Sequence, residues 1–130
     1  MTLVDTNVVL DVLLAGAEHG DDSERRLAAA LRAGPVIVND VIAAELAPVF
    51  DSAAALWSAF RDAQIELVPY PREAVFIAGS AFKRYRRQGG RRDRILPDFM
   101  IGAHALAARA RLLTRDGRFY RTSFPALRLA

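Results

Sequence analysis

The sequence predicts an α/β fold with a central, mostly parallel sheet of four to five strands and helices on both faces. Short, wholly apolar runs recur along the chain, as is typical of strands covered on both sides. Segments with helical spacing of apolar residues separate these runs, and strands that alternate with helices form parallel sheets. The chain has 130 residues, enough for one core. We therefore expect a single domain over residues 1–130.

The first predicted strand, at residues 3–4, runs directly into an aspartate. Asp5 follows the strand, and the apolar stretch at residues 8–14 then predicts a helix. In open α/β sheets, ligands bind at the carboxyl ends of the strands. Asp5 is therefore expected at such an end, beside the beginning of a helix.

The other elements are predicted from the same spacings and from the capping residues, glycines and prolines at their ends. Further helices are expected at residues 23–32, 39–46, 53–62, 71–88 and 99–109. Further strands are expected at residues 36–38, 65–68 and 111–114, with a fifth at the sheet edge at residues 126–129. Asp22 or Ser23 is expected to cap the helix at residues 23–32. Pro97 suits a first helical position, which would put Asp98 in the first turn, where the helix dipole favours a carboxylate.

Four carboxylates stand out by their positions. Asp5 and Asp116 directly follow strands, Asp98 begins a helix, and Glu45 shares the apolar face of its helix by the i, i+3, i+4 rule. All four could converge at the carboxyl edge of one sheet. Carboxylates packed together repel one another unless a cation lies among them. The chain has no cysteine, and no histidine lies near these positions, so the ligands would all be oxygen atoms, which favours Mg²⁺ or Mn²⁺.

Each of these acids also has a structural interpretation. An aspartate after a strand is often a turn residue or a helix cap. Asp98 could serve only its helix dipole, and Glu45 could be a rim residue with a buried stem. The four together favour the functional interpretation, and Asn7 and Thr114 would add neutral oxygen donors at the same strand ends. His19 and His104 are expected at the surface or in helix packing.

Composition restricts the class of protein. The absence of cysteine excludes disulfides and thiolate metal sites. No apolar run approaches the ~20 residues of a membrane span, and no secretion signal is evident, so we expect a cytoplasmic protein without membrane contact. The formal net charge is +3, with basic residues concentrated in the second half. Such a basic half suits a polyanion such as nucleic acid, although the cluster at residues 83–94 could also be a solvated face.

Several segments together resemble the PIN-domain nucleases, and within them the VapC toxins of prokaryotic toxin–antitoxin pairs. The resemblance covers residues 1 to about 129. It depends on four acids in an ordered set of contexts, which is more specific than any one motif. The segments that carry it are residues 3–11, 44–46, 97–105 and 113–116.

The resemblance implies a PIN-like three-layer α/β/α domain that acts as a Mg²⁺- or Mn²⁺-dependent endoribonuclease. It also implies a homodimer, inhibited by a VapB-type antitoxin that reaches into the acidic groove. The implied metal ligands and catalytic acids are Asp5, Glu45, Asp98 and Asp116, with Thr114 and Asn7 supporting the site. Arginines beside the groove would hold the RNA backbone, and the candidates are Arg86, Arg87, Arg91 and Arg92.

Three alternatives remain at the level of sequence. The chain could be a PIN nuclease of RNA processing that is not a toxin. It could be a phosphatase with Asp5 as nucleophile, although such enzymes commonly have a second aspartate two residues later, where this chain has Asn7. It could also be a non-catalytic RNA-binding module whose acids serve as caps, in which case RNA binding would be indifferent to Mg²⁺.

Overall fold

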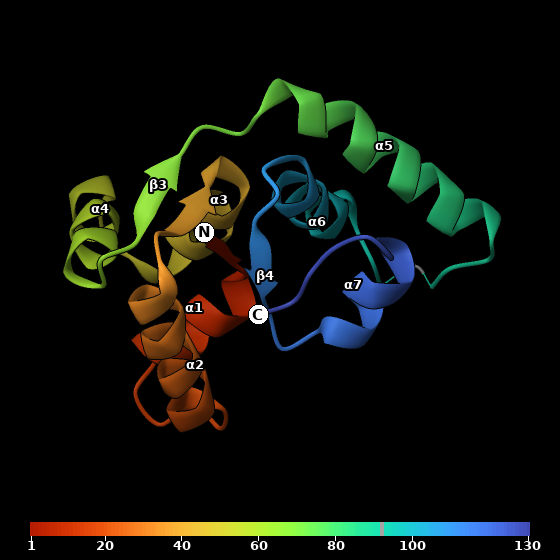
Figure 1. Ribbon diagram of the computed structural model, residues 1–130. Helices are drawn as coiled ribbons and strands as arrows, with labels where there is room; N and C mark the ends of the chain where they lie inside the picture. The colour runs from red at the N-terminus through yellow and green to blue at the C-terminus, as the bar shows by residue number, and fades with distance from the viewer. Residues whose placement is uncertain (92) are drawn as a thin grey trace.

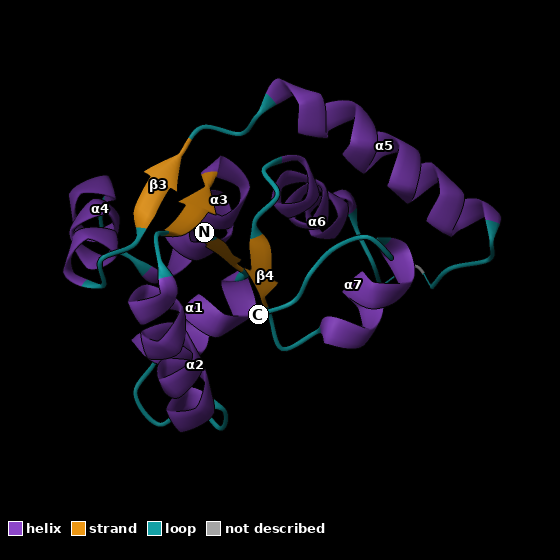
Figure 2. Cartoon of the chain, viewed as in Figure 1, coloured by secondary structure: helices purple, strands orange, loops and turns teal. Residues whose placement is uncertain are grey.

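A parallel sheet forms the centre of the molecule (Figures 1 and 2). A computed structural model describes residues 1–91 and 93–130 of the chain. Within these ranges the sheet has four strands in the order β3-β2-β1-β4, and every neighbouring pair is parallel. The strands are β1 (Thr2–Val4), β2 (Val36–Asn39), β3 (Glu66–Val68) and β4 (Arg111–Leu113). The predicted fold class is therefore confirmed. Arg92, one of the predicted RNA-binding residues, lies outside the described residues.

Helices enclose the sheet in three α/β/α layers, with α1 packed against α2 and α5 against α6 (Figure 1). Most begin and end within a few residues of the predicted bounds. The helices are α1 (Thr6–Leu13), α2 (Gly20–Ala33), α3 (Asp40–Leu46), the 3₁₀ turn η1 (Ala47–Val49), α4 (Ala53–Asp62), α5 (Arg72–Arg87), α6 (Leu96–Ala107) and α7 (Gly117–Ser123).

The strand order places the candidate acids at one edge of the sheet. From the central strand β1 the chain adds β2 and β3 on one side and later β4 on the other, so the order reverses between β1 and β4. Such a switch point is where open α/β sheets bind ligands. Helix α6 leads into the beginning of β4, so its own first turn lies at the opposite, carboxyl edge. Asp98 is thereby brought to the edge at which Asp5 and Asp116 follow their strands.

Two predictions near the chain ends were wrong. Helix α2 begins three residues earlier than predicted, and Ser23 does not cap it, because its buried hydroxyl instead donates to Asp11 at 2.6 Å. The predicted fifth strand is reduced to one parallel bridge between Leu112 and Leu129. Helix α7, which follows Asp116, was not predicted.

His104 lies in the core, in helix α6, and has a polar partner. Its Nδ1 lies 2.9 Å from Nδ2 of Asn39, and both side chains are buried. The Asn39 oxygen also caps α3 by accepting from the Ile42 amide at 2.9 Å. Burial lowers the pKa of His104, so its neutral ring accepts from Asn39 and ties α3 to α6.

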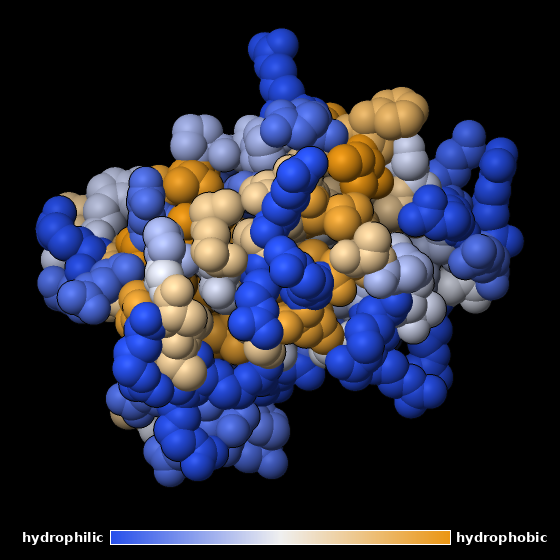
Figure 3. Space-filling view, viewed as in Figure 1, coloured by the Kyte–Doolittle hydropathy of each residue, from blue (hydrophilic) through white to orange (hydrophobic). Residues whose placement is uncertain are grey.

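The surface over α5 changes character along the helix (Figure 3). Hydrophobic atoms gather over its first half, where Val75 and Phe76 are exposed. Its last turn carries Arg84, Arg86 and Arg87.

No single helix of the described residues is long and apolar enough to cross a membrane, although the bent pair Asp40–Val49 and Ala53–Asp62 passes the same test of length and composition.

Candidate functional site

Asp5 lies at the end of β1, at the centre of the acidic edge. It is 6% exposed and caps α1, with Oδ1 accepting from the Thr6 amide at 2.7 Å. Its Oδ2 accepts from the Thr114 hydroxyl at 2.7 Å and from Nδ2 of Asn7 at 3.3 Å. The predicted neutral donors Asn7 and Thr114 therefore lie beside Asp5 and hold its carboxylate in place.

The pKa of Asp5 is raised by burial and by neighbouring carboxylates. Burial raises the pKa of Asp5 to about 6, outweighing the hydrogen bonds from Thr114 and Thr6, and the Glu45 and Asp98 carboxylates raise it further. Burial also raises the pKa of Asp98. A cation among these groups would relieve the penalty.

Thr114 links the ends of β1 and β4. While its hydroxyl donates to Asp5, the same oxygen accepts from the Asp116 amide at 2.9 Å. Thr114 is buried, so these bonds are shielded from water. The backbone that carries Asp116 is thus set relative to Asp5 through one hydroxyl.

Asp98 both caps a helix and contributes negative charge to the acidic edge. Its Oδ2 accepts from the Ile95 amide at 3.1 Å, which caps the beginning of α6, and Pro97 lies in the same first turn as predicted. The carboxylate is also close enough to Asp5 to raise the pKa of Asp5. Asp98 therefore stabilises its own helix and adds negative charge to the edge.

Glu45 is exposed at the rim of the site, so the prediction that it shares the apolar face of α3 was wrong. Helix α3 has only seven residues and buries Ile42, Ala43 and Leu46. Glu45 instead accepts a 2.7 Å hydrogen bond from the Thr6 hydroxyl. This bond turns its carboxylate toward the beginning of α1, where Asp5 lies.

Arg94 supplies a positive charge beside the acids, a role that the sequence did not predict. Its guanidinium forms an ion pair with Asp116 and lies over the ring of Phe119, 4.3 Å from the ring centroid. Arg94 precedes Asp98 by four residues, but its pairing depends on how the chain before α6 folds onto α7. The Asp116 carboxylate is therefore balanced by a cation from within the chain.

Tyr120 is the second residue that the sequence did not single out. It is buried, and burial raises the pKa of its phenol, with further increases from Asp5, Asp98, Asp116 and Glu45. All four acids act on the same phenol, as expected of carboxylates at one edge of the sheet. The spacing of Tyr120, four residues after Asp116, would have pointed to it had α7 been predicted.

The residue types at this edge fit a hard divalent cation. Carboxylate, amide and hydroxyl oxygens are the ligands that Mg²⁺ and Mn²⁺ take, and the raised pKa of Asp5 marks an excess of negative charge. As the side chains stand, no three acids of the described residues lie close enough to hold one ion. Glu45 faces Thr6 and Asp116 faces Arg94, so ion binding would require these two carboxylates to turn.

A second buried acid, Asp11, braces the loop behind the site. Its carboxylate accepts from Nε and Nη2 of Arg115 at 2.6 and 3.2 Å and from the Ser23 hydroxyl at 2.6 Å. The Arg115 amide donates to Oδ1 of Asn7 at 3.2 Å. These bonds tie the segment between β4 and α7, which carries Asp116, to α1.

Three of the predicted RNA-binding arginines belong to the described residues, and they lie at the end of α5 and in the segment after it. Arg86 and Arg87 are exposed in the last turn of α5, and Arg91 is exposed three residues after Gln88, the residue that follows this helix. The structure connects this basic region to the acids through Arg94, which lines a cavity together with Arg86 and Arg91.

Comparison with known proteins identifies the family. A family model described as PIN domain matches residues 2–125, nearly the whole chain. None of the curated proteins compared with the chain matches it.

Solved structures share the fold over nearly their full length. One is VapBC2 from Rickettsia felis, whose crystal structure contains a DNA fragment from its promoter. It is 19% identical, with 99% of this chain and 96% of that chain covered and a TM-score of 0.75. VapBC-1 from nontypeable Haemophilus influenzae is 16% identical with the same coverage and a TM-score of 0.72. DNA-bound VapBC from Salmonella typhimurium is 19% identical, also with 99% and 96% covered, and has a TM-score of 0.71. At these identities the likeness shows the fold.

Proposed function

Since the chain belongs to the PIN domain family, whose members are nucleases, we propose that it is a metal-dependent endoribonuclease and the toxin of a toxin–antitoxin pair. The observation that carries the proposal is that hydrogen bonds link the surroundings of Asp5, at the end of β1, to two distant acids, with Thr6 donating to Glu45 and Thr114 accepting from the Asp116 amide. The four candidate acids are Asp5, Glu45, Asp98 and Asp116. We propose that residues 1–130 form one nuclease domain.

The proposed roles follow from the positions of the side chains. The four acids would hold Mg²⁺, or Mn²⁺, which when bound supplies an activated water and neutralises charge on the phosphate. Thr114 and Asn7 keep the Asp5 carboxylate oriented by donating to its Oδ2. Burial of Asp5 excludes water from one side of the site, which strengthens its electrostatic interactions. No side chain is needed as a covalent nucleophile.

Metal dependence tests this proposal directly. Purified protein is incubated with structured RNAs in EDTA, and then with Mg²⁺ or Mn²⁺ in excess of the chelator. Cleavage should be absent in EDTA and return with either metal. Full cleavage in excess chelator would contradict the metal role. RNA binding that is indifferent to Mg²⁺ and never leads to cleavage would favour a non-catalytic module, and an aspartyl-phosphate on Asp5 would favour a phosphatase.

The partners are proposed from the relatives whose structures share the fold. Those structures are toxin–antitoxin complexes, two of them with DNA. We propose that this chain forms a homodimer and is inhibited by a VapB-type antitoxin. An antitoxin arginine could pair with the acids, since guanidinium and carboxylate groups form strong bidentate bonds.

The growth of a bacterial host that expresses the chain distinguishes a toxin from a nuclease that acts in RNA processing. Expression of the chain alone should arrest growth of a bacterial host, and the Asp5→Asn variant, expressed at the same level, should not. Normal growth with active wild-type enzyme would favour RNA processing.

A further inference from the structure

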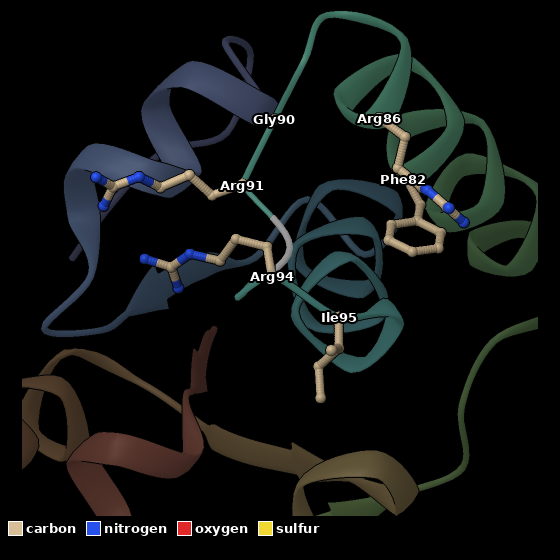
Figure 4. A pocket seen from close by; sticks show the side chains of 6 residues that line it. All are labelled: Phe82, Arg86, Gly90, Arg91, Arg94 and Ile95. Atoms are coloured by element: carbon tan, nitrogen blue, oxygen red, sulfur yellow. The ribbon is translucent and has the colours of Figure 1, made fainter.

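A cavity of about 440 Å³ lies between the end of α5 and the segment that leads into α6 (Figure 4). Cavities of this size hold small molecules in other proteins. Three of the six residues on its walls are arginines, and no acid lines it among the described residues. The residues on its walls are Phe82, Arg86, Gly90, Arg91, Arg94 and Ile95.

The positive charge of this cavity is only partly neutralised. Arg94 pairs with Asp116, whereas Arg86 and Arg91 form no ion pair with any carboxylate in residues 1–91 or 93–130. Figure 4 shows the Arg91 and Arg94 guanidinium groups pointing to the same side, with Arg86 on the opposite wall. Guanidinium groups bind phosphate bidentately, so an anion of this class would relieve the charge.

The rest of the wall is apolar and aromatic. The ring centroids of Phe82 and Phe99 lie 5.2 Å apart, and the Arg86 guanidinium lies 5.6 Å from the centroid of the Phe82 ring. Ile95 is 55% exposed, which is high for an isoleucine. Proteins bind single-stranded RNA with this combination, in which bases stack on aromatic rings and arginines hold the backbone.

Arg94 joins the cavity to the acids. One side chain both lines the cavity and contacts Asp116, so the two sites are neighbours. A strand whose reacting phosphate lies at the acids would therefore bring an adjoining nucleotide to the cavity.

We propose that this cavity binds one nucleotide of the RNA strand, the one adjoining the phosphodiester that is cut. Arg91 holds its phosphate from one wall, and its base lies against Phe82 and Ile95, beside the Arg86 guanidinium on the opposite wall. The inference rests on the proposed nuclease function and deepens it, because it assigns sequence preference to one cavity and not to the basic face as a whole.

Binding is measured without cleavage, so that the test does not depend on activity. A short, mixed-sequence, fluorescent single-stranded RNA is titrated with protein in EDTA, and its anisotropy gives Kd. Arg86→Gln and Arg91→Gln should each weaken binding about tenfold. Arg72→Gln removes the same charge at the opposite end of α5, and Arg32→Gln removes it at the end of α2, near the opposite edge of the sheet. Both controls should change Kd less than about twofold.

An equal loss in Arg86→Gln and Arg72→Gln would overturn the proposal, because it would show a diffuse basic face. Displacement of the RNA by poly-glutamate at matched charge would overturn it too, by assigning the cavity to an acidic protein segment. Circular dichroism melting of each variant checks that it is folded. If wild-type protein shows the expected pattern of binding but never cuts RNA with Mn²⁺, the nuclease proposal fails and the nucleotide site stands.

Sequence preference gives a second measurement. The fragments produced with Mn²⁺ are sequenced for wild type and for two cavity variants, Phe82→Leu and Ile95→Ser. The base preference at the position next to the cut should weaken in both variants. Phe82 is half-buried and could affect folding, whereas Ile95 is exposed, so the second variant keeps the test valid. An unchanged preference in folded Ile95→Ser and Phe82→Leu would overturn the role of the apolar wall.

Discussion

Asp5 and Asp11 lie at opposite ends of helix α1 and are equally buried, at 6% and 8% exposed, yet their surroundings differ in kind. Asp11 meets a guanidinium and a hydroxyl, from Arg115 and Ser23. Although burial raises its pKa, those hydrogen bonds and the Arg115 charge together hold the pKa below its usual value. Asp5 meets only neutral donors and the fields of other carboxylates, and its pKa rises. In this pair, the two pKa values therefore shift in opposite directions at a similar exposed fraction, and Asp11 alone has a positive partner.

The largest expected effect is on the rate of RNA cleavage, where Asp5 and Asp11 should differ most. Asp5→Asn keeps the shape of the side chain and removes a charge from the proposed metal site. RNA cleavage should fall at least ~100-fold, a barrier increase of about 2.7 kcal/mol. The matched variant Asp11→Asn, from the same helix, should lose less than ~10-fold if it is folded. Rates are measured with saturating Mn²⁺, and similar losses in the two variants would contradict the distinction.

The second effect concerns the free energy of unfolding. Here we expect the larger loss from Asp11→Asn and not from Asp5→Asn. Asp11→Asn leaves the Arg115 guanidinium without its charged partner, and we expect a loss of about 2 kcal/mol in the free energy of unfolding. The figure lies below that of a fully buried pair because the Arg115 side chain is 34% exposed. Urea denaturation of metal-free protein measures it. A change under about 0.5 kcal/mol would show that solvent screens the pair.

The smallest effect is the pH dependence of stability in metal-free protein. The pKa of Asp5 is about 6 in the folded chain against 3.8 for a free aspartate, so its favourable contribution is full below pH ~4 and is lost as pH rises through ~6. Asp5→Asn lacks this loss. At pH 7.5 in EDTA the variant should be more stable than wild type by on the order of 1–2 kcal/mol, and the gap should close toward pH 4. A gap that is constant with pH would contradict the raised pKa.

The fold could be predicted, and the four acids could be singled out as candidates, because these signals are local. Apolar runs and helical spacing need only neighbouring residues, and they predicted the strands and most helices. Helix α7 escaped because seven residues beginning with Gly117 are too few to display a period. The face of Glu45 was wrong for the same reason, since α3 is equally short.

Long-range pairing explains the other differences. The contact of Arg94 with Asp116 joins the segment before α6 to the turn before α7, and no spacing in the sequence reports it. Likewise, the Asn39–His104 bond spans 65 residues. Local patterns therefore identified which acids to consider, whereas their counter-charges emerged only from the tertiary structure.

The hydrogen bond between Thr114 and Asp5 also bears on when the enzyme becomes complete during synthesis. It joins residues 109 positions apart, and β4 pairs with β1 over a similar span. A ribosome makes the chain from the N-terminus, so Asp5, Glu45 and Asp98 are all made before β4. Contacts this distant form late, after the entropy of closing a long loop has been overcome. The acidic edge thus stays incomplete until the last strand docks, so the proposed nuclease activity would appear only after nearly the whole chain has been made.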